Sequence, residues 1–203
     1  MTLHPLFALL FLGSLFSSGE DQKPAEESLT FKVDQVPDWK ARLELSEILA
    51  QQKKYDEAEK EVQKVLKEKP DSTDAKLTLA EILTRKGNEA AAQKILQGIQ
   101  VASLTEKQML KRASIESLQE NFEEAEEIYA KLLQKNPKND LARLKLAETF
   151  SWDKKYDQSL LEFERLLKVY PEDTNLRRKY AFVLNWMGEK DLAAEELRKT
   201  LRD

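Results

Sequence analysis

Apolar residues recur three and four positions apart along most of the chain after residue 38, for example at Leu45 and Leu49 and at Leu146 and Phe150. This spacing places the apolar side chains on one face of an α-helix and the polar side chains on the other. Glycine, which weakens helices, is scarce, since only three of the five glycines lie beyond residue 19. The pattern predicts an all-α fold without strands over residues 39–201.

Small residues form two columns that repeat along the sequence in steps of 33 or 34 positions. A small side chain recurs where two helices cross closely, because a larger one would push the helices apart. The periodicity therefore predicts a series of two-helix units with one close crossing in each. The first column contains Ser46, Ala80, Ala113, Ala147 and Ala181, and the second contains Ala58, Ala92, Ala125, Ser159 and Ala193.

The ends of the predicted helices carry start and stop signals. Asp38, Ser72 and Asn139 are residue types that cap a helix N-terminus, and Thr105 with Gln108 has the spacing of a capping box. Proline cannot continue a helix. Three of the second helices are therefore expected to stop before Pro70, Pro137 and Pro171.

A period of about 34 residues with two helices per unit resembles the tetratricopeptide repeat family. The resemblance covers residues 38–203, as five repeats at 39–72, 73–105, 106–139, 140–173 and 174–203. It implies ten antiparallel helices in five pairs, stacked into a right-handed α-solenoid whose first helices line a concave groove. It also implies that extended peptides or partner helices bind in this groove.

The columns expected to face the groove hold the candidate binding residues. Glu47, Glu81 and Glu148 share one column, so the N-terminal half of the groove is expected to be polar and acidic. Some family members clamp a C-terminal carboxylate with cations in these columns, and the acidic residues here argue against that activity. Trp152 and Trp186, one repeat apart, either contact a ligand or cover an inter-helix turn. The full candidate set is Leu118, Leu144, Glu148, Trp152, Arg178, Phe182 and Trp186.

The third unit departs from the apolar pattern. Arg112 and Glu116 stand where the other units have leucine or an aromatic residue. We expect the first helix of this unit either to turn slightly or to pack less well, and turning would bury Met109, Leu110, Ile115 and Leu118. Because the stability of a repeat array is a sum of interactions between neighbours, the middle of the array is expected to be its least protected part.

Residues 1–19 contain no Lys, Arg, Asp or Glu, and residues 6–16 form a nearly unbroken apolar run followed by small residues. This layout predicts a secretory signal peptide at 1–19, cleaved after Gly19, and a chain that is periplasmic or secreted. The alternative is an uncleaved anchor, although the run is shorter than the ~20 residues of a spanning helix. No stable membrane span is expected after cleavage. Residues 20–37 are predicted to be a charged linker.

Composition argues against several classes of function. The chain has no cysteine and one histidine, His4, so removal of residues 1–19 would leave no residue for Cys-His or Ser-His-Asp catalysis or for imidazole or thiolate zinc sites. A net charge of −4 argues against nucleic-acid binding. The 37 carboxylates interleave with 33 basic residues, which is typical of solvated helix faces. We expect no enzymatic activity, no cofactor and no metal.

The last two repeats also resemble a narrower group, the periplasmic repeat modules of exopolysaccharide exporters such as those for cellulose and poly-N-acetylglucosamine. The resemblance lies in residues 146–153 and 180–188, where Trp152 or Trp186 precedes the turn between helices. It implies a carbohydrate-binding or assembly role in a polysaccharide secretion complex.

These observations together favour a protein-interaction scaffold of an exported compartment, with a protein partner in the groove. The alternatives are a carbohydrate-binding or assembly module and a self-assembling structural module. Self-association would use the last repeat, because repeat arrays usually end in a polar capping helix and none is apparent here. Some of the following apolar residues are then expected to have no neighbour: Leu176, Val183, Met187, Leu197 and Leu201.

Overall fold

A computed structural model describes residues 37–201 of the chain. The predicted signal peptide at 1–19 and the predicted linker up to residue 36 lie outside the described residues. No helix within residues 37–201 is long and apolar enough to cross a membrane.

The described residues form ten α-helices, one short 3₁₀ helix and no strand, which confirms the all-α prediction. The helices are α1 (Asp38–Gln51), α2 (Tyr55–Glu68), α3 (Thr73–Arg85), α4 (Glu89–Gln97), η1 (Val101–Ser103), α5 (Glu106–Leu118), α6 (Phe122–Lys135), α7 (Asp140–Trp152), α8 (Tyr156–Val169), α9 (Thr174–Met187) and α10 (Lys190–Arg198).

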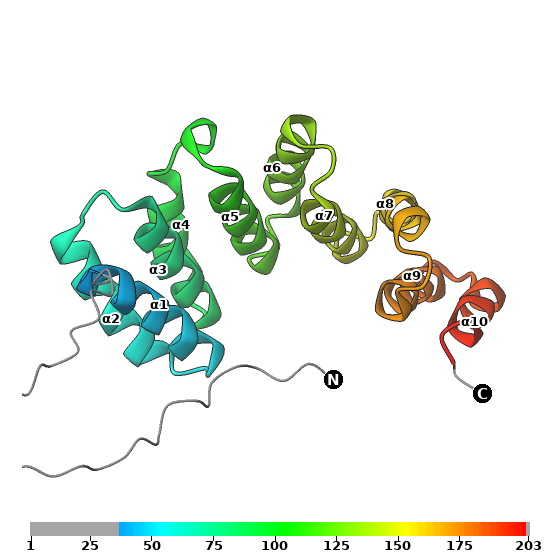
Figure 1. Cartoon of the computed structure of the whole chain (residues 1–203), viewed down its shortest axis with the longest axis horizontal. Coiled ribbons are helices and arrows are strands. Elements are labelled where there is room, and N and C mark those ends of the chain that lie inside the picture. Colours follow the sequence, from blue (N-terminus) through cyan, green and yellow to red (C-terminus); the bar gives the residue numbers. More distant parts are fainter. Residues whose placement is uncertain (1–36, 202–203) are drawn as a thin grey trace, which may run out of the picture. The chain divides into compact units, whose positions relative to one another are not determined.

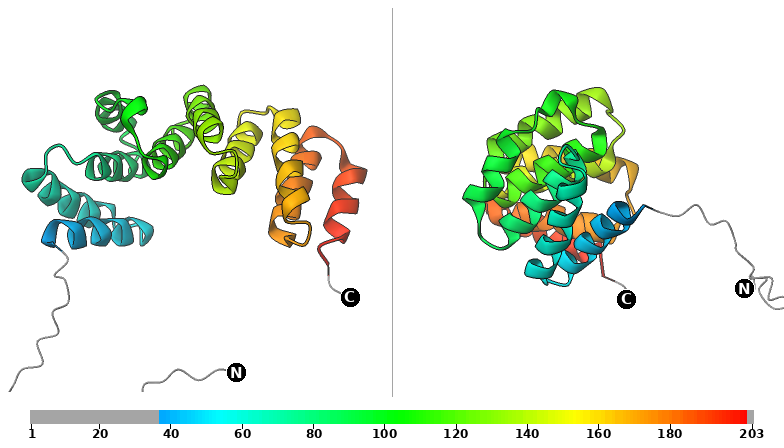
Figure 2. Two further views of the ribbon diagram at one scale, coloured as in Figure 1. Left: turned by 45° about the horizontal axis from the view of Figure 1, so that its top comes forward. Right: turned by 90° about the vertical axis from the view of Figure 1, so that its left-hand side faces the viewer.

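The α-helices pack as five consecutive pairs that follow one another in chain order (Figure 1; Figure 2). The first helices of neighbouring pairs also touch, α1 with α3, α3 with α5 and α5 with α7. All ten residues of the two small columns are buried. In α7 and α8 the two columns meet directly, because Ser159 Oγ donates a hydrogen bond to the Ala147 carbonyl at 2.7 Å.

Most of the predicted helix starts are confirmed. Ser72 and Asn139 accept hydrogen bonds from backbone N–H groups in the first turns of α3 and α7, and Thr105 forms the complete capping box with Gln108. Asp38 is not a cap, since it is the first residue of α1 and Pro37 precedes it. The helices before Pro70, Pro137 and Pro171 end two residues before the proline.

The turn inside every pair is closed by one residue with a positive φ angle. A left-handed residue ends a helix and lets the chain reverse, and glycine adopts this conformation most easily. Only two of the five pairs use glycine here. The five residues, one repeat apart, are Lys53, Gly87, Glu120, Lys154 and Gly188.

The third pair does not turn its two unusual polar residues away from the core. Arg112 and Glu116 are both buried, and their side chains form an ion pair with Arg112 Nη2 2.7 Å from Glu116 Oε1. The expectation about the neighbouring apolar residues holds in part. Met109 and Ile115 are buried, whereas Leu118 is exposed.

Further hydrogen bonds complete this buried ion pair. Arg112 Nη1 donates to the carbonyl of Leu96, close to the end of α4, which has only nine residues. Glu116 Oε2 accepts from Gln93 Nε2 at 2.8 Å and from Asn121 Nδ2 at 2.9 Å. The short second helix before it thus provides part of the polar environment that lets α5 bury a charged pair.

The fifth pair buries some of its apolar residues and leaves others exposed, as the sequence predicts. Leu176 and Val183 lie in the apolar cluster that contains Phe163 and therefore have apolar neighbours. Met187 and Leu201 are exposed, as expected.

Candidate binding groove

A cavity of about 690 Å³ lies along the first helices α1, α3, α5 and α7, and we call it the groove. Much of its apolar surface comes from α5 and α7, through Leu110, Leu118, Leu141 and Trp152. Its polar surface includes the hydroxyls of Thr78, Ser114 and Ser117. The charged side chains of the lining are Glu47, Lys53, Glu81, Arg85, Lys111 and Lys145.

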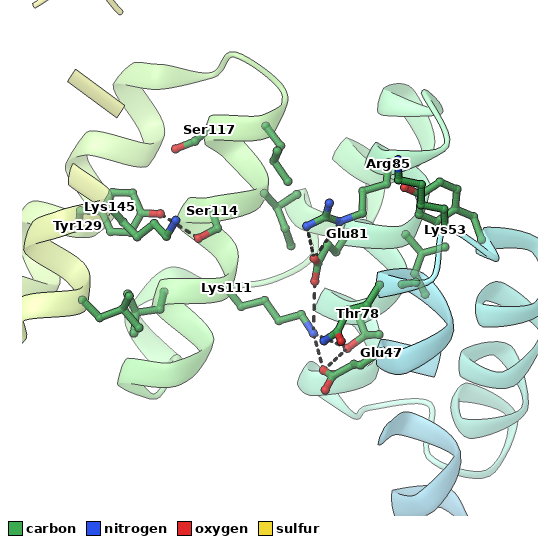
Figure 3. A pocket seen from close by; sticks show the side chains of 18 of the residues that line it. Glu47, Lys53, Thr78, Glu81, Arg85, Lys111, Ser114, Ser117, Tyr129 and Lys145 are labelled. Atoms are coloured by element: carbon green, nitrogen blue, oxygen red, sulfur yellow. Dashed lines mark hydrogen bonds and ion pairs between the residues drawn. The ribbon is translucent and has the colours of Figure 1, made fainter. Parts of the chain in front are cut away.

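Lys111 connects three helices in the polar part of the groove (Figure 3). Its Nζ lies 2.7 Å from Glu47 Oε1 on α1 and 3.6 Å from Glu81 Oε2 on α3, and it donates to Thr78 Oγ1 at 2.7 Å. Arg85 Nη2 lies 3.0 Å from Glu81 Oε1. Both carboxylates of the lining therefore have a cationic partner.

The prediction of an acidic N-terminal half of the groove is therefore wrong. The lining holds two carboxylates and four cationic side chains. The prediction rested on three columns of the repeat, among them the one with Glu47 and Glu81, and it missed the column three residues before these glutamates. A repeating signal was present there, because Lys111, Lys145 and Lys179 recur at steps of 34 residues.

Glu148 on α7 lies between two of these lysines. Lys145 Nζ is 2.8 Å from Glu148 Oε2, and Lys179 Nζ on α9 is 2.7 Å from Glu148 Oε1. Burial raises the pKa of Glu148, but hydrogen bonds from the two lysines outweigh burial and hold its pKa below the ordinary value. Glu148 is therefore ionised at neutral pH and links α7 to α9.

Hydroxyl groups join α5 to its neighbours at the groove. The Ser114 and Tyr129 hydroxyls are 2.9 Å apart, as are those of Ser117 and Thr149. Burial raises the pKa of Tyr129 to about 12, so it remains a neutral hydroxyl. Within residues 37–201, no group of His, Cys, Asp and Glu side chains is arranged to hold a metal ion.

The candidate aromatic residues lie in the groove and beyond it on α9. Leu118 and Trp152 line the groove, with exposed fractions of 45% and 48%. Phe182 and Trp186 follow on α9, where their rings stack with centroids 6.5 Å apart. About half of each of these two residues is exposed, at 50% and 52%.

Five of the seven candidate residues do not line the groove: Glu148, Phe182 and Trp186, described above, and also Leu144 and Arg178. Leu144 is partly buried against the apolar cluster that contains Phe163. Arg178 donates from Nε to Thr200 Oγ1 at 3.2 Å and so connects α9 to the residues after α10. The equivalent residues of other repeats differ in their surroundings, since Leu110 lines the groove and Leu77 is fully buried.

The same arrangement of paired helices occurs in known proteins. The family model for the tetratricopeptide repeat matches residues 49–102 and 118–176. The chain belongs to the tetratricopeptide repeat family. This confirms the resemblance in the repeating columns, and proteins of this family are generally non-catalytic scaffolds. Comparison with curated protein sequences gives no match.

Solved tetratricopeptide repeat structures share the fold at low sequence identity. A tetratricopeptide repeat protein from Parabacteroides merdae is 22% identical with a TM-score of 0.66, over 83% of this chain and 66% of that one. PilF of Pseudomonas aeruginosa is 19% identical with a TM-score of 0.63, over 81% and 77%. MamA is 16% identical with a TM-score of 0.59, over 80% and 90%. The chain thus spans just under two thirds of the first of these proteins.

Proposed function

We propose that this tetratricopeptide repeat chain is a non-enzymatic scaffold that binds a partner protein in the groove. One observation carries the proposal: Leu118, Leu141 and Trp152 present exposed apolar surface beside a line of charged groups within one cavity. Apolar anchors surrounded by polar groups are typical of protein-binding surfaces.

The compartment is part of this proposal. The uncharged apolar run at residues 6–16 supports export to the periplasm or secretion. Fractionation of cells followed by mass spectrometry of the mature N-terminus tests this, with a new N-terminus at Glu20 expected. An intact Met1 on a chain in the cytoplasmic fraction would contradict it.

Site-specific photo-crosslinking tests the groove. Benzoyl-phenylalanine replaces Leu118, which lines the groove. In the matched control it replaces Lys131 on α6, which lies outside the groove. In intact cells we expect a defined protein adduct from position 118 and none from position 131. Equal adducts from both positions, or none from either, would contradict groove binding.

A second candidate function is carbohydrate binding, and the stacked, half-exposed rings of Phe182 and Trp186 favour it. Aromatic faces of this kind can stack on sugar rings. Tryptophan fluorescence titrated with cello-oligosaccharides and with N-acetylglucosamine oligomers tests this function. A Trp186→Ala variant should lose the response.

Self-association through the exposed Met187 and Leu201 is tested by sedimentation at two concentrations, where an unchanged monomer would exclude it.

A further inference from the structure

The chemistry of the groove narrows the kind of partner that fits it. This inference rests on the proposed binding of a partner protein in the groove. The lining holds two more cationic than anionic side chains, in a chain whose net charge is −4. Lys53 has no ion-pair partner among residues 37–201, and both lining carboxylates are paired with Lys111 or Arg85. Lys145 and Lys179 share the single carboxylate of Glu148, so cations exceed carboxylates even when Lys179 and Glu148 are counted with the lining. An acidic ligand is therefore electrostatically favoured over a basic one.

Two columns run side by side along α5, α7 and α9. The basic column is Lys111, Lys145 and Lys179, and the apolar column is Leu118, Trp152 and Trp186. On each helix the two columns are seven residues apart, which is two helical turns or about 10 Å. The apolar side chains are about half exposed, and the lysine side chains are exposed to 21%, 38% and 48%.

Two lysines of the basic column contact the first helix of the preceding repeat. Lys111 on α5 reaches Thr78 on α3, and Lys179 on α9 reaches Glu148 on α7. Packed neighbouring helices lie about 8–10 Å apart. A chain laid across the first helices therefore meets a lysine on one side and an apolar side chain on the other about once in every 10 Å.

An extended peptide can match this repeat. In a polyproline II helix each edge recurs every three residues, and three residues advance about 9 Å. We propose that the groove, together with the surface of α9 that follows it, binds an extended segment of a partner protein. This segment carries carboxylates along one edge and apolar side chains along the other, each at intervals of three residues. The carboxylates face the lysine column, and the apolar side chains contact Leu118, Trp152 and Trp186.

Four synthetic peptides of twelve residues test the proposal against the whole chain. The first contains four copies of Asp-Leu-Pro, and the second replaces every Asp with Lys. The third replaces every Leu with Ser, and the fourth has the composition of the first in a block order. Fluorescence anisotropy of labelled peptides at low salt should show binding of the first at least tenfold tighter than binding of each of the others.

Variants of the chain locate the binding. The pair Lys145→Gln and Lys179→Gln should weaken binding of the Asp-Leu-Pro peptide at least fivefold, and Lys131→Gln on α6 is the matched control that should leave it unchanged. Stronger binding of the Lys-Leu-Pro peptide, equal binding of the block peptide, or equal loss with Lys131→Gln would overturn the inference. So would the absence of binding by all four peptides. Groove crosslinks from position 118 together with any of these results would leave the proposed scaffold function standing and remove only the inference.

Discussion

The adjacent helix pairs α5–α6 and α7–α8 are related by a shift of 34 residues, yet they place charged and apolar contacts at exchanged positions. In α7–α8, Arg143 Nη1 on the first helix lies 2.6 Å from Glu162 Oε2 on the second. The equivalent residues in α5–α6 are Met109 and Ile128, which are both buried.

One helical turn further along, the charged residues are in α5 and the apolar residues are in α7. In α5 the buried ion pair joins Arg112 and Glu116. The equivalent residues of α7 are Leu146, which is buried, and Phe150, which is partly buried against the same apolar cluster. The α7–α8 arrangement is the commoner one, because equivalent ion pairs occur at Arg42–Glu61 and Arg177–Glu196.

The comparison shows that an equivalent position of the repeat can hold either an ion pair or an apolar contact, provided that both residues of the contact are of the same kind. A buried ion pair is tolerated when hydrogen bonds satisfy its remaining polar atoms. Arg112 is satisfied partly by the Leu96 carbonyl of the short α4, and Glu116 by Gln93 and Asn121. The third pair is thus adapted to the unusual second pair that precedes it.

The buried pair should give the largest response to substitution. Arg112→Met leaves Glu116 buried without a cation, and removal of one partner of a buried ion pair costs about 3–5 kcal/mol. We expect a loss of this size in the free energy of unfolding, measured by urea denaturation at pH 7.

A double variant separates charge burial from packing. Arg112→Leu with Glu116→Leu restores the apolar residue types of the other pairs, and such replacements are often neutral or stabilising. The double variant should therefore be more stable than the single variant Arg112→Met. A double variant that is less stable than the single one would show that the third pair depends on the ion pair itself.

The equivalent contact of the fourth pair should respond less. Arg143→Met removes one partner of Glu162, but Arg165 still forms an ion pair with Glu162. Because Arg143 is partly exposed and Arg165 remains beside Glu162, the loss in the free energy of unfolding should be about 1–2 kcal/mol. The same denaturation experiment measures it. A loss as large as that of Arg112→Met would mean that the two sites do not differ in the way their burial suggests.

Periodicity predicted the fold because the small columns leave little choice of packing. Alanine or serine every 33 or 34 residues fixes where helices cross, and all ten of these residues are buried. The starts of α3, α5 and α7 could also be predicted, because Ser72, Thr105 and Asn139 each accept a hydrogen bond from the first turn of their own helix.

The groove was predicted less well, because its character depends on contacts between repeats. Lys111 pairs with Glu47, 64 residues away, and no pattern within one repeat indicates that distance. The burial of Arg112 depends on the carbonyl that the short α4 presents to it. Sequence columns identify which residues share a face, and contacts across three helices decide the net charge of that face.

Two carboxylates at the boundaries of the fourth pair have opposite pKa shifts. Glu126 on α6 has one oxygen, Oε1, that is buried without a hydrogen-bond partner. Burial raises the pKa of Glu126 above the ordinary value despite Lys155 Nζ at 2.7 Å from its other oxygen. Glu148 on α7 has a lowered pKa, because its two lysines outweigh burial.

These shifts predict opposite pH dependence for two otherwise equivalent substitutions. The lowered pKa of Glu148 stabilises the fold above its ordinary value of 4.5, and this stabilisation is lost as the pH falls through the folded pKa. Glu148→Gln should therefore lose about 1 kcal/mol or less at pH 7 and approach the parent chain near pH 3.

The raised pKa of Glu126 means that its ionised form costs stability at pH 7, and that this cost disappears as the pH falls through the folded pKa toward 4.5. Glu126→Gln should then be at least as stable as the parent chain at pH 7 and lose that relative advantage at low pH. Urea denaturation of both variants across this pH range measures the difference, and parallel pH profiles for the two variants would show that the lysines around Glu148 do not outweigh its burial.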